Sequence, residues 1–441
     1  RASALFPFLF STIRRPPGST PFPSTTVFRS DDSQSGKDLK DAVDELQRLN
    51  LGEGLDELVE SAVNAHGENW GLLQEASSAY WHVQHWGYIL DGEFKRGHHR
   101  GGGRYVSSMG RDRVRAIQLI LEAIEKAEGV ATAQKRGELN SSLANLVQMG
   151  RTGMRQVWAL GVLTPLDVLP DYGEDSSLSS GSGAPVDDEG NALVISIPES
   201  WEAARNDGER WRWAITETAR VDPGRKSEVE SQWANFLVQH FGVRTLSGYG
   251  WWRQSDPSEA EGILQVHTLK ETETIASLAS GVKRFELPKD YQFIPLLRKI
   301  SGAGKGGSRA SAGDLLVQVL LDRRQFGQAV TELSRVITTH GNGHEQHRLK
   351  LLHQIQRDWG RFEYAPMFQA GEKALVNYVY RNAEEATLSL HALKINLVVA
   401  DIFKHLESNP RTVDHKTINI GAIGQRRSEE RRGGEECRSR S

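Results

Sequence analysis

The sequence contains almost no cysteine. Among its 441 residues the only cysteine is Cys437, near the carboxyl-terminal end. A single cysteine cannot form an internal disulfide, and it excludes a metal site built from several thiolates. This scarcity does not assign a compartment, because many exported proteins have no disulfides.

Long hydrophobic runs and a strong net charge are also missing. No stretch approaches the roughly 18 apolar residues of a membrane-spanning helix. The apolar residues 4–10 are few and include Pro7, and without a small-residue cleavage site they do not indicate a signal peptide. The formal net charge is −3, which gives no reason to expect nucleic acid or an anionic membrane as a partner.

Known catalytic signatures are absent as well. The sequence has no nucleophile elbow, no H-E-x-x-H motif and no cysteine–histidine pairing. Nothing marks two carboxylates as an acid–base pair. We therefore expect a protein that is not an enzyme and needs no cofactor, and we assign no catalytic, cofactor-binding or metal-binding residue.

The two ends differ in composition from the rest. Residues 1–36 are rich in proline, serine and threonine, and residues 425–441 are dense in charge with no apolar anchor. Both segments are expected to be disordered. They resemble translated sequencing-adapter read-through, so we interpret them as foreign sequence, in which Cys437 has no biological role.

Residues 37–357 are predicted to be mainly helical. Their apolar residues recur at helical spacing in successive short stripes: Leu39, Val43, Leu46 and Leu49; Leu55, Leu58, Val59, Ala62 and Val63; Trp70, Leu73, Ala76, Tyr80 and Val83; Val114, Ile117, Ile120, Leu121 and Ile124; Leu139, Leu143, Leu146 and Val147. A short helix with one apolar face can bury it only against neighbouring helices, which is typical of a repeat array.

The clearest repeat spans residues 312–340 and follows the tetratricopeptide pattern. A first helix, a turn at residues 322–325 and a second helix are predicted, with the small Ala329 at the helix crossing and Gly341 as part of the stop. The other repeats are irregular, so we predict a tetratricopeptide-like solenoid. Loops are expected near residues 171–198 and 248–266, with a short strand at 193–197 and a glycine-rich loop at 301–308.

The pattern changes after Trp359. Residues 374–380 and 387–393 are rich in β-branched and aromatic side chains and flank a polar connector, which predicts a hairpin. A short helix is predicted at residues 398–407. We interpret residues 358–424 as the incomplete start of a β domain.

Four groups of residues are candidate sites, and each also has a purely structural interpretation. His98 and His99 could bind a metal or belong to a phosphate loop, but we favour a tight loop between two helices. The glycine-rich residues 302–308 lack the P-loop spacing and follow a predicted helix, so we favour a linker. His340, His344 and His347 could bind a metal, with His344 and His347 one turn apart on a predicted helix, but no carboxylate completes the set, and we do not favour a metal site. Trp201, Trp211, Trp213 and Trp233 lie on predicted helical segments and could line an aromatic cleft, but we favour core packing.

Several strings together resemble the N-terminal region of large bacterial alpha-2-macroglobulin-family proteins. In chain order they are Glu68–Gln74, His99–Val106, Arg111–Ala116, Ala203–Trp213, His267–Leu269, Glu273–Ala276, Val282–Pro288, Asp358–Glu363 and Ile418–Gly421. This resemblance implies an exported protein of the periplasm or cell surface that contacts other proteins, with proteases as targets of the missing C-terminal part.

Members of that family trap proteases through a cleaved bait segment and, in many cases, a thioester from a Cys-Gly-Glu-Gln run. The chain has no such run, and no bait region can be assigned. We therefore expect a non-enzymatic helical scaffold at the N-terminus of such a protein. The alternatives are a tetratricopeptide-like adaptor that binds peptides and a metal-binding enzyme that uses the histidines.

Overall fold

The structure is a computed structural model that describes residues 32–49, 51–149, 157–173, 183–249 and 265–364, and shorter pieces between residues 368 and 430. Residues 1–31 and most of residues 425–441, which were predicted to be disordered, lie outside the described residues. The prediction of a mainly helical chain is confirmed, and the described residues also form a few small sheets, of which only a β element after residue 358 was predicted. Within the described residues, no helix is long and apolar enough to cross a membrane.

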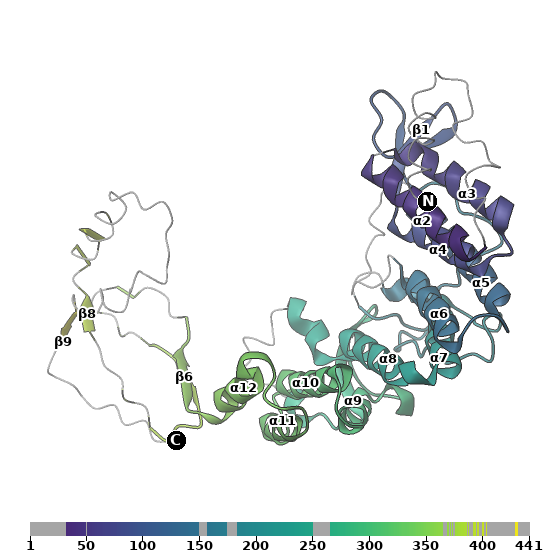
Figure 1. The fold of residues 1–441 in the computed structure, drawn as a ribbon. Helices are drawn as coiled ribbons and strands as arrows, with labels where there is room; N and C mark the ends of the chain where they lie inside the picture. Colours follow the sequence, from purple (N-terminus) through teal and green to yellow (C-terminus); the bar gives the residue numbers. More distant parts are fainter. Residues whose placement is uncertain are drawn as a thin grey trace. The chain divides into compact units, whose positions relative to one another are not determined.

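The first five helices are α2 (Asp32–Arg48), α3 (Leu55–His66), α4 (Trp70–His82), α5 (Met109–Ala127) and α6 (Ala133–Gln148) (Figure 1). Polar side chains begin two of them, because the first backbone N–H groups of a helix lack internal partners. Asn69 accepts hydrogen bonds from two amides of α4, and Thr132 accepts one from α6.

Helix α2 begins at Asp32, inside the segment that was expected to be disordered. Ser35 is buried and accepts a hydrogen bond from Asn69 at 2.7 Å. Gly36 lies so close to Gly71 that an added Cβ would be 2.9 Å from its carbonyl oxygen. These contacts with the start of α4 order the residues before the predicted boundary.

The later helices are α7 (Asp207–Val221), α8 (Lys226–Phe241), α9 (Phe293–Gly302), α10 (Gly307–Asp322), α11 (Phe326–His340) and α12 (His347–Gln356). Single-turn 3-10 helices lie between several of them; the longer ones are η3 (Val157–Gly161) and η5 (Val243–Tyr249). The predicted helical pair at residues 312–340 is confirmed as α10 and α11. Ala329 is completely buried there, and Gly341 follows α11 with a positive φ of 76°.

The main contacts between helices join elements that are neighbours along the chain. From α3 to α11, each helix contacts the next helix along the chain. In addition, α2 packs against α3 and α4, and α10 packs against α8. One hydrophobic cluster continues through these helices. Each apolar face is therefore covered mainly by the elements that follow or precede it.

Helices α9, α10 and α11 approach one another at Gly313. An added Cβ would be 2.7 Å from the Ser301 hydroxyl of α9 and 2.7 Å from a methyl group of Val336 in α11. Both neighbours are fully buried, and the β-branched Val336 has little freedom to change its χ1 angle. The three-helix contact therefore depends on the missing side chain.

Two glycine-to-alanine substitutions should have opposite effects. Gly313→Ala should lower the free energy of unfolding by about 1–3 kcal/mol, because it overpacks this contact. Gly327→Ala, in the first turn of α11 with nothing within 4 Å of the added Cβ, should be neutral or stabilising by up to about 1 kcal/mol. Urea unfolding measures both. Equal effects of the two substitutions would contradict the close approach.

A three-stranded antiparallel sheet interrupts the helices, where a tight loop between two helices was predicted. Its strands are β1 (Trp86–Leu90), β2 (Glu93–Arg96) and β3 (Arg104–Ser107), in the order β2-β1-β3. The β1–β2 turn is Asp91-Gly92, and both residues have positive φ, as a two-residue hairpin requires. The loop interpretation is therefore correct only for residues 97–103.

A second hairpin was also missed. Strands β4 (Glu273–Leu278) and β5 (Gly281–Glu286) pair antiparallel within the segment predicted to be helical. β4 is buried along almost its whole length. Its Ser277 accepts a backbone hydrogen bond from Ala184, and Ala279, just after the strand, donates one to Ala184. The predicted strand at residues 193–197 is wrong: this segment is irregular, and Ile195 is buried and bonded to the Tyr291 hydroxyl.

The described part of the predicted loop at 171–198 is thus packed against other elements. Of the predicted loop at residues 248–266, residues 250–264 lie outside the described range.

The contacts divide the chain into two units, residues 1–349 and 350–441, close to the predicted boundary after residue 357. In the second unit, β6 (Trp359–Phe362) pairs with β7 (Tyr378–Arg381), and β8 (His391–Leu393) pairs with β9 (Ser428–Glu430). The predicted hairpin between residues 374–380 and 387–393 is therefore wrong, because each segment pairs elsewhere. Most of the predicted helix at 398–407 lies outside the described residues.

β9 also lies within residues 425–441, which were expected to be disordered, and its three residues form a strand with β8.

Candidate functional site

A buried ionic network fixes the small sheet to the helices. Arg96 of β2 is 3% exposed and donates to both oxygens of Asp112 in α5, each at 2.9 Å, and to Asp56 of α3 at 2.6 and 3.1 Å. It also donates to the Ser108 hydroxyl. His85 is 2.8 Å from Asp112 through Nδ1. The network thus joins β2 to α3 and α5 through hydrogen bonds of a single guanidinium group.

The network also controls the ionisation of Asp112. Burial alone would raise the pKa of this carboxyl group, but hydrogen bonds from His85 and Arg96 outweigh it and hold the pKa below its usual value. A carboxyl group with a lowered pKa in the folded state stabilises the fold above its unfolded pKa, near 4, and loses that contribution as the pH falls.

Acid should therefore destabilise the first unit, in part through Asp112. The free energy of unfolding should fall as the pH is lowered from about 5 toward about 2, measured by urea titration at a series of pH values. Asp112→Asn should be less stable than the wild type near neutral pH and show a shallower pH dependence. A wild-type curve that rises on acidification would contradict this assignment.

A second network joins α5, α6 and α7. Arg113 is 4% exposed and donates to Asp207 at 2.8 Å and to the carbonyl oxygens of Leu146 and Val147 at the end of α6. Asp207 also accepts from the backbone amide of Thr164 at 3.0 Å. The Arg113–Asp207 pair therefore joins α5 to the end of α6 and the start of α7.

The tryptophan-rich segment forms core packing and not an open cleft. Trp211 and Trp233 are 1% and 7% exposed and lie 5.8 Å apart, and the Arg212 guanidinium lies 3.7 Å from the Trp233 ring centre. The interpretation as core is confirmed for these residues. Trp201, expected on a helix, instead lies in a turn before α7, 6.0 Å from Trp213.

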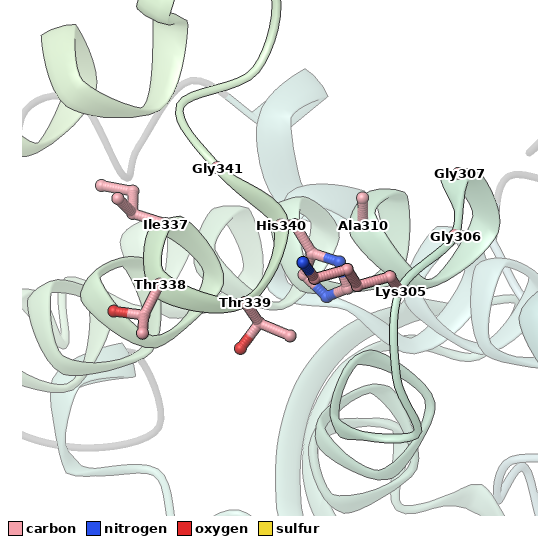
Figure 2. Close-up of a pocket in the computed structure, with 9 residues that line it drawn as sticks. All are labelled: Lys305, Gly306, Gly307, Ala310, Ile337, Thr338, Thr339, His340 and Gly341. Atoms are coloured by element: carbon pink, nitrogen blue, oxygen red, sulfur yellow. The ribbon is translucent and has the colours of Figure 1, made fainter.

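An open pocket of about 570 Å³ lies between the start of α10 and the end of α11. It brings together two of the predicted candidates, the glycine-rich segment and His340. Figure 2 shows Lys305 and His340 beside each other, with Thr338 and Thr339 just before His340 in the last turn of α11. The Lys305 side chain and the first backbone amides of α10 could bind an anionic group such as a carboxylate. The glycine-rich segment follows helix α9, as predicted.

The three candidate histidines do not converge. His340 contacts the Ser301 carbonyl oxygen at 3.0 Å, whereas His347 lies 3.8 Å from Asp314 through Nε2. His344 and His347 were predicted on one helix, but Glu345 between them has a positive φ of 48° and breaks it. Within the described residues, no three histidine, cysteine or acidic side chains are grouped to hold a metal ion.

His98 and His99 lie against the aromatic side chains of the sheet. The His98 ring is 5.0 Å from Trp86, and the His99 ring is 6.1 Å from Tyr88. Tyr105 of β3 is paired with Tyr88, and its ring lies 5.6 Å from the Tyr88 ring and 6.0 Å from the Trp86 ring. We call Trp86, Tyr88, Tyr105, His98 and His99 the aromatic face.

The sequence did not indicate the aromatic face, because the three strands were not recognised. The signal was present in Asp91-Gly92 between two short runs with alternating aromatic residues, which is typical of a hairpin. Comparison with protein-family models, curated proteins and solved structures gave no match for this chain.

Proposed function

We propose that this chain is a non-enzymatic helical scaffold that serves protein–protein contacts, with its first unit arranged as a tetratricopeptide-like solenoid. The observation that carries this proposal is the order of the helix contacts, which follow the chain from α2 to α11. In repeat arrays each element is stabilised mainly by its neighbours, and one apolar core continues through the stack.

The hydrogen bonds of the buried arginines also support a structural role. Arg96, Arg113 and Arg323 are each at most 4% exposed. The first two pair with carboxylates, and Arg323 donates to the carbonyl oxygens of Lys270 and Glu273 at 3.0 and 2.9 Å. Burial lowers the pKa of Arg323 to about 10, so it remains cationic near neutral pH. These groups tie helices, hairpins and loops together.

We further propose that the scaffold forms the N-terminal part of an exported alpha-2-macroglobulin-like protein. The β6–β7 pair supports this proposal, because large apolar side chains on it are exposed: Phe362, Val379 and Tyr380 are 57%, 40% and 42% exposed. Two strands are marginal by themselves, so this surface suits further strands of a β-sandwich.

A second candidate function is a tetratricopeptide-like adaptor that binds a peptide. The pocket at α10 and α11 favours it, since Lys305 offers a positive charge next to apolar and hydroxyl-bearing side chains. This candidate shares the scaffold and differs only in having a peptide as its ligand.

Incubation with trypsin, chymotrypsin and subtilisin tests the proposed function. We expect no covalent adduct on denaturing gels, because no Cys-Gly-Glu-Gln run exists to form a thioester. An adduct that methylamine prevents would contradict the proposal. Elemental analysis of the purified chain is a second test. A stoichiometric transition metal would contradict the proposed scaffold and favour the alternative of a metal-binding enzyme that uses the histidines.

A further inference from the structure

We propose that Asn342 is a site of spontaneous deamidation, through which the loop after α11 gains a carboxylate group. Asn342-Gly343 is the one Asn-Gly pair among the 441 residues. Asparagine amides are chemically labile, and a following glycine favours the reaction, because it has no side chain to keep its nitrogen away from the asparagine side chain. Both residues are exposed and lie between α11 and the 3-10 helix η9 (His344–Gln346).

The two groups that would react have no hydrogen-bond partner. Among the described residues, no hydrogen bond involves the Asn342 side chain or the backbone N–H of Gly343. The loop is held through its carbonyl groups instead. The Arg348 backbone N–H donates to the Asn342 oxygen at 3.1 Å, and the Arg348 guanidinium donates to the Gly341 oxygen at 2.8 Å. Neither reacting group therefore has to give up a hydrogen bond of the fold.

The other exposed asparagines within the described ranges lack one of these features. Some lie inside α3, α6 and α8, where the following N–H belongs to the helix hydrogen bonds: Asn64, Asn145 and Asn235. The rest precede alanine, leucine or tyrosine, whose side chains hinder the approach of the nitrogen: Asn191, Asn377, Asn382 and Asn396. The fold thus permits this reaction most readily at Asn342.

The reaction needs only water besides the chain itself. The Gly343 nitrogen attacks the side-chain carbonyl carbon Cγ of Asn342, the bond from Cγ to the side-chain nitrogen breaks, and ammonia leaves with the proton of the Gly343 N–H. Water then opens the resulting succinimide ring. Attack of water at Cγ gives aspartate, whereas attack at the backbone carbonyl carbon gives isoaspartate, in which the main chain runs through the side chain and is longer by a methylene group.

Isoaspartate should loosen the start of α12, because Arg348 in its first turn is bonded to the Asn342 backbone. The Arg348 side chain is fixed independently, since it is buried and donates to both carboxylate oxygens of Asp314 at 2.7 Å each. An added methylene group displaces the Asn342 oxygen from the Arg348 N–H. Aspartate leaves the main chain unchanged and should keep this bond.

Mass spectrometry of the full-length chain, aged at physiological temperature and mildly alkaline pH, tests the proposal. Trypsin then releases residues 336–348. This peptide should gain the mass that replaces an amide NH2 by OH, and an isoaspartyl methyltransferase should label part of it. The rate in the folded chain should lie within about tenfold of the rate in urea, because an exposed loop opens locally at little cost. Asn191 should remain an amide over the same time.

Two variants at the same position separate the effects. Asn342→Gln keeps the amide on a longer side chain that closes a ring more slowly, so its peptide should stay unchanged. Asn342→Asp supplies the charge without the methylene group. In hydrogen exchange, the aged wild type should contain a population whose Arg348 amide exchanges at least about tenfold faster, and Asn342→Asp should not.

Three results would overturn the proposal. Conversion in urea alone would mean that the fold holds the Gly343 nitrogen away from Cγ. Equally fast conversion of Asn191 would mean that the free groups at Asn342 confer no selectivity. Unchanged exchange at Arg348 in chains that carry isoaspartate would contradict the effect on α12.

Discussion

Replacing Arg96 with methionine should lower the free energy of unfolding of the first unit by about 3–5 kcal/mol. The substitution keeps most of the apolar stem but removes the guanidinium that binds Asp112 and Asp56. Asp112 would remain 3% exposed without its main positive partner. Urea unfolding followed by circular dichroism at neutral pH measures the loss.

The matched control is Lys40→Met, which removes an exposed pair with Asp44 one turn away in α2. Solvent-exposed pairs contribute about 0–1 kcal/mol, so this variant should unfold almost like the wild type. If both substitutions cost the same, the Arg96 network would not be the link that holds the sheet to α3 and α5.

Replacing Arg113 with methionine should cost a similar amount, about 3–5 kcal/mol. Arg113 serves two purposes: it neutralises Asp207, and it donates to two carbonyl oxygens at the end of α6. Its loss leaves a buried carboxylate in the first turn of α7 and unpaired acceptors in α6. The measurement is again urea unfolding at neutral pH.

A double-mutant cycle separates the ion pair from the rest. Asp207→Asn removes the negative charge, so Arg113→Met in that background should cost less than in the wild type. The expected coupling is about 1–3 kcal/mol. Strictly additive effects would mean that Arg113 stabilises the fold independently of Asp207, through its other hydrogen bonds, such as those to the α6 carbonyl groups and the Thr164 hydroxyl.

Helical periodicity predicted much of the fold. The stripes from Leu39 to Val147 lie on helices with buried apolar faces, and the pair at residues 312–340 was placed within a few residues. These predictions succeeded because an amphipathic helix repeats its apolar positions within a single segment. The solenoid itself remains a proposal, because stacking depends on contacts between segments.

The hairpins were missed because they are short and lie among helices. β1 and β2 have only five and four residues, too few for a clear alternation, although Asp91-Gly92 is a recognisable turn. β4 is buried at almost every position, so it lacks the alternation of apolar and polar residues that would distinguish it from a short buried helix. The pairing of β6 with β7 joins segments 16 residues or more apart, which no local pattern reveals.

The candidate sites show the same limit. His98 and His99 were noticed, but their aromatic neighbours Trp86, Tyr88 and Tyr105 come from different strands and meet only in the folded chain. Arg96 and Asp112 are 16 positions apart on a strand and a helix, so no local sequence pattern indicates that they pair. The sequence shows which residues could take part in such contacts, whereas the residues that they contact are known only from the folded chain.

Hydrogen exchange of the Gly313→Ala variant tests the central claim most directly. If each helix is stabilised mainly by its neighbours, amides in α9, α10 and α11 should lose protection while those in α3, α4 and α5 keep theirs. An equal loss of protection in both groups of helices would mean that the first unit unfolds as one cooperative body, and it would contradict the proposed stack.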